Sequence, residues 1–87
     1  MSTQDEQMAR IAEVQAKYTD ELMRKAHVQG TAIGLAKVDG KYTNQIALVV
    51  LVDKKVPASQ LDPKDVIPQE LDGVRVDVQE VGVLQAQ

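Results

Sequence analysis

The side chains able to carry out chemistry are few in this chain of 87 residues. Serine-type nucleophilic catalysis needs an imidazole, a nucleophile and a carboxylate that converge on one point. The chain has a single histidine, His27, and its serines are Ser2, near the start, and Ser59, in a Pro-Ala-Ser-Gln turn. Neither serine lies in the strained strand-to-helix turn of a nucleophile elbow. The sequence therefore predicts no catalytic residue and a protein that is not an enzyme.

The sequence also has few residues that could form a metal or cofactor site. Carboxylates gather in sequence at Asp62, Asp65, Glu70 and Asp72, but without the Asp-x-Asn-x-Asp-Gly spacing of a calcium loop. We interpret them as capping and solvated groups. The chain has no cysteine to supply a thiolate ligand, and no glycine-rich loop opens a helix as phosphate binding requires. We therefore expect neither a metal nor a cofactor.

One group of basic residues is a candidate binding site. A hairpin turn centred near Gly40–Tyr42 would bring the end of the second strand beside the end of the leading helix. The basic residues that would gather there are Arg24, Lys25, His27, Lys54 and Lys55. Such a patch suits an acidic partner or a chain terminus, although the aspartates close to it in sequence would neutralise it. His27 alone is typical of a cation at a helix end.

Charge and composition exclude several classes of partner. The net charge is −3 and the only aromatic residues are two tyrosines, so the chain offers neither a field nor stacking surfaces for nucleic acid. The longest apolar run, 46–52, is far shorter than the roughly 20 residues of a membrane-spanning helix. The first residues lack the basic flank and apolar run of a secretory signal. We expect a cytoplasmic protein with no nucleic acid or membrane partner.

A single helix is predicted over residues 4–27, where apolar residues recur every three or four positions on one stripe. These residues are Met8, Ile11, Val14, Tyr18, Leu22 and Ala26. After Gly30 the period changes to two, which predicts strands over 30–38, 45–54 and 73–81. We expect residues 82–87 to form a loose tail.

The connections between these strands have distinct signals. Asp39-Gly40 is typical of a tight hairpin turn, which we expect Lys41–Asn44 to complete as a loop. Three prolines between residues 56 and 73 leave room only for single helical turns. In the first strand Ala32, Gly34 and Ala36 share a smooth face, against which we expect the helix or a second chain.

The second strand is apolar on both of its faces, and one helix covers only one of them. The face expected to meet a second copy or another partner holds Ala47, Val49 and Leu51. The sequence therefore predicts a homodimer. The fold class is α+β, a single domain over 1–87 with an N-terminal amphipathic helix packed on a three-stranded, mainly antiparallel sheet. The strand order stays open: the third strand lies beside the first, or the second strand lies in the middle.

Three segments resemble a known module when they are read in order. They are Gly30-Thr-Ala-Ile-Gly-Leu-Ala, Ile46-Ala-Leu-Val-Val-Leu-Val-Asp-Lys-Lys-Val-Pro57 and Asp65-Val-Ile-Pro-Gln-Glu-Leu-Asp-Gly-Val-Arg-Val-Asp-Val-Gln-Glu-Val-Gly82. Over residues 28–82 the chain is similar to the short accessory module that precedes the catalytic domain of some bacterial trypsin-like serine peptidases. In that family the catalytic triad belongs to the following domain, so the resemblance implies no catalytic residue here.

The leading functional hypothesis is a small non-catalytic protein-interaction module, homodimeric, that binds through the uncovered sheet face or a strand edge, with 74–81 as the first edge to test. A second hypothesis is a regulatory or folding element that acts in trans on a separate trypsin-like peptidase domain. A third, nucleic-acid binding, is disfavoured by the acidic charge.

Overall fold

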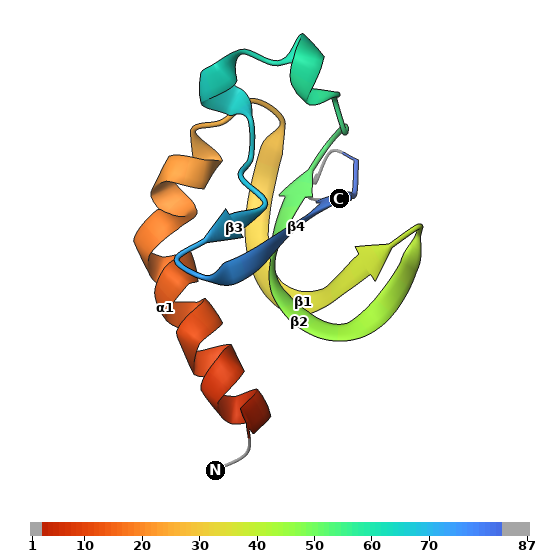
Figure 1. The fold of residues 1–87 in the computed structure, drawn as a ribbon. Coiled ribbons are helices and arrows are strands. Elements are labelled where there is room, and N and C mark those ends of the chain that lie inside the picture. Colours follow the sequence, from red (N-terminus) through yellow and green to blue (C-terminus); the bar gives the residue numbers. More distant parts are fainter. Residues whose placement is uncertain (1–2, 83–87) are drawn as a thin grey trace, which may run out of the picture.

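The computed structural model describes residues 3–82, which form one helix and a four-stranded sheet (Figure 1). The elements are α1 (Thr3–Met23), β1 (Val28–Val38), β2 (Lys41–Val52), 3-10 turns at Ala58–Gln60 and Pro63–Asp65, β3 (Glu70–Leu71) and β4 (Val74–Glu80). The predicted α+β class with a leading helix is confirmed. The predicted tail lies, apart from Gly82, outside the described residues. No helix in the described part of the chain is long and apolar enough to cross a membrane.

The strand order is β1-β2-β4-β3, so the sheet is mixed. β1 and β2 pair antiparallel, as do β3 and β4, whereas β2 and β4 are parallel. β2 therefore lies inside the sheet, which is one of the two orders left open, and the order with the third predicted strand beside the first is wrong. The three-stranded prediction misses β3, a strand of two residues.

The core lies between α1 and one face of the sheet. Ile11, Val14 and Leu22 of the helix pack with Leu48 and Val50 of β2, and Leu22, Leu48 and Val50 are the largest fully buried side chains. The helix covers the bulky face of β1: Gln15 Nε2 donates to Thr31 Oγ1 at 3.2 Å, and Ile33 packs against the core. The expectation that the helix packs on the smooth face of β1 is therefore wrong. Bulky side chains are needed to fill the space between a helix and a sheet, and the smooth face has none.

The face of the sheet without the helix is covered in part by the chain itself, because the β1–β2 hairpin curls strongly (Figure 1). Lys37 N donates to Asp77 Oδ2 at 2.9 Å, and Gln79 Nε2 donates to the Leu35 carbonyl at 3.1 Å, so both β4 side chains hold the far half of β1. A register shift between Leu35 and Lys37 accompanies the bend. As a result Ala47 is 0% and Val49 4% exposed.

The element boundaries differ most at two places. The helix ends at Met23 rather than at residue 27, because the Ala26 amide donates to Asp65 Oδ1 at 3.0 Å and His27 takes a left-handed φ of 73°. β2 begins at Lys41 rather than at residue 45, because the hairpin turn needs only two residues. Asp39 and Gly40 have φ of 52° and 78°, the conformation that a type I′ turn requires.

The other predicted boundaries differ by no more than two residues. β1 starts at Val28 instead of residue 30, and β2 ends at Val52 instead of residue 54. The last strand, expected over 73–81, is β4, Val74–Glu80. It is not a free edge along its first half, because β3 pairs with it there and Val76 N donates to the Gln69 carbonyl at 3.0 Å.

Candidate functional site

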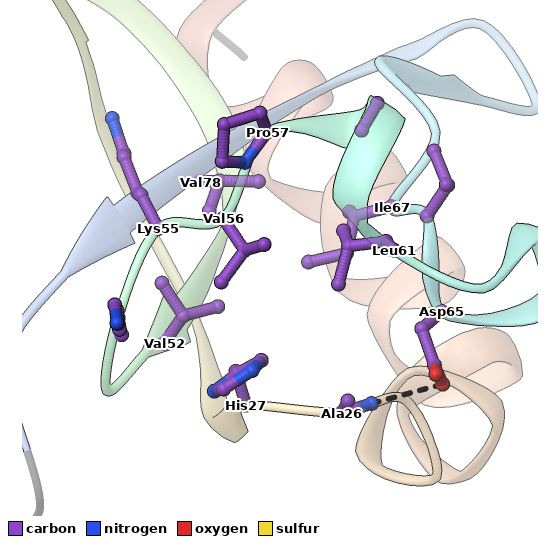
Figure 2. Close-up of a pocket in the computed structure, with 13 residues that line it drawn as sticks. Ala26, His27, Val52, Lys55, Val56, Pro57, Leu61, Asp65, Ile67 and Val78 are labelled. Carbon is purple, nitrogen blue, oxygen red and sulfur yellow. Dashed lines mark hydrogen bonds between the residues drawn. The ribbon is translucent and has the colours of Figure 1, made fainter.

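An apolar pocket of about 440 Å³ lies at one end of the sheet, between the ends of the parallel strands and the crossover that joins them. Val52 of β2 and Val78 of β4 contribute to its lining from the sheet. Val56, Leu61 and Ile67 come from the crossover, and Figure 2 shows their side chains directed into a common space. The first residues after the helix, Ala26 and His27, border the same space.

The crossover forms a wall of this pocket because its prolines prevent a continuous helix. It contains two separate 3-10 turns, the second of which starts at Pro63 and is capped by Asp62, whose side chain accepts from Lys64 N at 3.2 Å. Leu61 lies between the turns and is only half-buried, with Ala58 exposed beside it. Apart from Val52, which is 2% exposed, the valine, leucine and isoleucine side chains that line the pocket are only half-buried.

Two contacts hold the crossover against the end of α1. Ala26 N donates to Asp65 Oδ1, as the dashed line in Figure 2 shows, and Lys25 Nζ donates to the Lys64 carbonyl at 2.6 Å. These contacts position the wall of the pocket without a bound partner. A pocket that exists before binding spares the partner the cost of ordering it.

The charged groups at the pocket differ in their partners. His27 Nδ1 lies 2.9 Å from Asp53 Oδ1, and Glu80 Oε1 accepts from the Lys55 backbone amide at 2.7 Å. The side chains of Lys54 and Lys55 are exposed, and neither ammonium group has a hydrogen bond or ion pair within residues 3–82. Of the aspartates expected to neutralise the basic group, Asp53 thus pairs with His27, whereas Asp62 and Asp65 accept from the backbone amides of Lys64 and Ala26.

The structure brings together three of the five predicted basic residues. His27, Lys54 and Lys55 line the pocket. Lys25 lies next to it but its ammonium contacts the crossover backbone. Arg24 is exposed and is not among the pocket-lining residues.

The predicted partner face is arranged differently from the expectation. Ala47 and Val49 are covered by the curl of their own hairpin, and Leu51 alone of the three is half-buried. The shelter that β2 needs on its second face is thus provided largely within one chain. The homodimer stays a prediction, but it loses the physical reason from which it was drawn.

The aliphatic lining was not predicted as a site. Leu61 and Ile67 were available as apolar residues between closely spaced prolines. In a segment that cannot form a helix, such residues pack on a neighbouring element or remain available to a partner, and that is the signal in the sequence. Their convergence with Val78 depends on the parallel pairing of β2 and β4, which the sequence left open.

A second polar cluster connects α1 to the turn between β3 and β4. Lys17 Nζ lies 3.1 Å from Asp72 Oδ2, and Tyr18 donates from its hydroxyl to Asp72 Oδ1 at 3.0 Å. The hydrogen bonds from Lys17 and Tyr18 lower the pKa of the Asp72 carboxyl, and the bond to Asp72 raises the pKa of the Lys17 ammonium. The described residues include no group of three or more histidine and carboxylate side chains suited to a metal. We interpret this cluster as structural.

The residues at the pocket do not assemble a hydrolase triad. His27 and Asp53 supply an imidazole and a carboxylate, but none of the pocket-lining residues is a serine. Ser59 lies in the first 3-10 turn, where it is exposed. Ser2 lies outside the described residues. What the arrangement offers is apolar surface beside two unpaired cations.

A family model described as the NARROW LEAF 1 N-terminal domain, a plant-type domain, matches residues 7–83. The match includes most of the leading helix, which the resemblance over 28–82 did not cover. It overturns that resemblance: the assignment to an accessory module of bacterial trypsin-like peptidases is wrong, and a bacterial origin has no support. No curated protein matches the chain.

Proposed function

Since the chain belongs to the NARROW LEAF 1 N-terminal domain family, whose description names no function, we propose a function from the geometry of the pocket. The protein is a small non-catalytic protein-interaction module that takes apolar side chains of a partner into the pocket at the end of the sheet. We place this role in the cytoplasm, as the sequence predicts.

The observation that carries the proposal is the pocket itself. Its volume of about 440 Å³ falls within the range of roughly 300–1,000 Å³ typical of ligand sites. Val52, Leu61 and Val78 give it an aliphatic lining, and the contacts of Ala26 and Lys25 with the crossover fix its wall. Burial of aliphatic surface is the main source of affinity at protein interfaces, and a fixed wall lowers the entropy lost on binding.

A binding role also fits the chemistry at the rim. The pair formed by His27 and Asp53 lacks a nucleophile among the pocket-lining residues, so the site offers recognition rather than covalent chemistry. Figure 2 shows His27 beside the aliphatic side chains, where a bound segment would contact its ring.

The experiment selects peptides that bind the protein and then measures their binding to a variant whose pocket is filled. A phage library of random dodecapeptides is selected on the immobilised protein, and the enriched peptides are measured by fluorescence polarisation. The variant Ala58→Trp places an indole at the pocket, and because Ala58 is exposed it leaves the core intact. A matched control is Val38→Trp, on the exposed end of β1.

We expect the selected peptides to bind the wild type and Val38→Trp alike and to bind Ala58→Trp at least about tenfold more weakly, since a filled pocket excludes the anchor side chain. Equal affinity for Ala58→Trp, or a selection that enriches no peptide, contradicts the proposal.

Self-association is a second candidate, supported by a different surface. Leu35 and Tyr42 are 42% and 64% exposed and, with Leu51, border a groove of about 350 Å³. Exposed apolar side chains around a groove favour an interface. We therefore keep the homodimer as a proposal at this groove, which Val49 and Leu51 of the predicted partner face help to line.

A further inference from the structure

We infer that the partner segment carries aliphatic residues followed by acidic ones, so that its carboxylates meet Lys54 and Lys55 while an aliphatic side chain fills the pocket. This inference rests on the proposed function and adds the chemical class of the partner.

The first step is the state of the two lysines. Both are exposed, both line the pocket, and within residues 3–82 their ammonium groups have no acceptor. The bond from the Lys55 amide to Glu80 Oε1 fixes the backbone from which its side chain extends. In Figure 2 that side chain leaves the apolar cluster with its nitrogen directed away from it. The Lys55 cation therefore lies outside the apolar cluster rather than within it.

The second step is the balance of charge at the pocket. The carboxylate among the pocket-lining residues is Asp65, and its Oδ1 already accepts from Ala26 N. Asp53 Oδ1 contacts His27, and Glu80 Oε1 accepts from Lys55 N. The two lysines thus face a single lining carboxylate that is turned toward the chain itself. Among the pocket-lining residues the two lysines thus outnumber the carboxylates by one, a balance opposite in sign to the net charge of −3, while Asp53 and Glu80 outside the lining remain negative.

The third step is the charge of the segment that Lys54 and Lys55 favour. A carboxylate that approaches the lysines gains attraction without displacing an existing ion pair, whereas a basic segment meets two like charges. The rest of the chain carries a net negative charge, which on average disfavours an acidic segment away from the pocket. Because both lysines are exposed, salt will screen the attraction.

The experiment uses three fluorescein-labelled peptides of equal length. The first has two leucines followed by three aspartates, the second has lysines in place of the aspartates, and the third has serines in place of the leucines. Each is titrated against the wild type, against Lys54→Glu/Lys55→Glu, and against the matched control Lys37→Glu/Lys41→Glu at the hairpin tip. Both double variants change the net charge equally. Circular dichroism spectra establish that each is folded.

We expect the leucine–aspartate peptide to bind most tightly to the wild type and to the hairpin control. Its affinity should fall about tenfold or more in Lys54→Glu/Lys55→Glu, and in the wild type it should fall as salt is raised from 50 to 500 mM. Octanoate joins an apolar chain to one carboxylate without a peptide. It should compete at least a hundredfold more weakly than the peptide, because it offers fewer contacts.

Other outcomes separate the inference from the function on which it rests. Equal binding of the aspartate and lysine peptides, with loss of binding by the serine peptide, overturns the acidic partner and leaves the apolar pocket as a docking site. Octanoate as effective as the leucine–aspartate peptide overturns a peptide partner. No binding by any of the three peptides, together with a dodecapeptide selection that enriches nothing, overturns the proposed function as well.

Discussion

Tyr18 and Asp72, which lie 54 positions apart in the chain, join the helix to the turn between β3 and β4 through a hydrogen bond of 3.0 Å from the tyrosine hydroxyl to Oδ1. Lys17 binds the other carboxylate oxygen, and Arg10 Nη2 donates to the Asp72 carbonyl at 2.7 Å. Three helix side chains therefore hold one turn residue. This contact positions β3 and β4, and with them the strand that supplies Val78 to the pocket.

The first prediction concerns acid stability. The pKa of Asp72 is lowered in the folded state, so its contribution is fully present above the unfolded value of about 4 and is lost as the pH falls through the folded value. The wild type should therefore lose more stability between pH 5 and pH 2 than Asp72→Asn, in thermal unfolding followed by circular dichroism. The raised pKa of Lys17 adds stability that is present below about 10.4 and is lost as the pH rises through the folded value.

Asp39→Asn is the matched control for the acid measurement. Asp39 lies in the other Asp-Gly turn with a similar φ, but within residues 3–82 its carboxylate has no hydrogen bond or ion pair. It should follow the wild-type profile. If Asp72→Asn lost as much stability at low pH as the wild type, Asp72 would not be a source of the acid sensitivity.

A second prediction concerns the backbone at the same turn. Gly73 has a φ of 81°, and a Cβ there would lie 3.2 Å from Arg10 Nη2. Gly73→Ala should therefore cost about 1–2 kcal/mol in the free energy of unfolding, measured with urea. Gly30→Ala is the control, because the nearest heavy atom to its Cβ is Leu51 Cδ1 at 4.0 Å. Equal effects of the two substitutions would be inconsistent with a left-handed requirement at Gly73.

A third prediction concerns the curl of the hairpin. Asp77 Oδ2 accepts from Lys37 N across the helix-free face. Asp77→Ala should cost about 1 kcal/mol and speed hydrogen exchange at the Lys37 amide, because one long-range hydrogen bond is lost. Asp77→Asn keeps an acceptor oxygen and should exchange like the wild type. Unchanged protection of Lys37 in Asp77→Ala would show that the curl does not depend on this contact.

The sequence predicts the local elements well. The helix follows from the spacing of Ile11, Val14 and Leu22, and the first hairpin from Asp39-Gly40, because both signals act between near neighbours. β3 was missed although Asp72-Gly73 repeats the same dipeptide, with φ of 49° and 81°. The prolines that precede β3, and its length of only two residues, leave no strand pattern in the sequence there.

The candidate site was harder to foresee because long-range contacts build it. The antiparallel pairing of β1 and β2 brings Lys54 and Lys55 to the pocket with His27, but the aliphatic lining needs the parallel pairing of β2 with β4. The end of the helix depends on Asp65, a residue 39 positions from the amide that it accepts from. Similarly, the bond between Asp77 and Lys37, which lies on the face that contains Val49, joins residues 40 positions apart. Local periodicity carries no information on such contacts.

A fourth prediction tests self-association. Light scattering should give a mass of about 19 kDa, twice the 9.5 kDa of one chain. Leu51→Lys, in the groove beside Tyr42, should return the single-chain mass, whereas the apolar Leu51→Met should not. A wild-type mass of 9.5 kDa at every concentration would leave the homodimer without support.

The most direct test of a docking pocket is an ¹⁵N NMR titration of the wild type with the leucine–aspartate peptide. We predict that the largest amide shifts fall at His27, Lys55 and Leu61, and that Ala58→Trp abolishes them. Shifts confined to the hairpin around Tyr42, or unchanged shifts in Ala58→Trp, would contradict the pocket as the binding site.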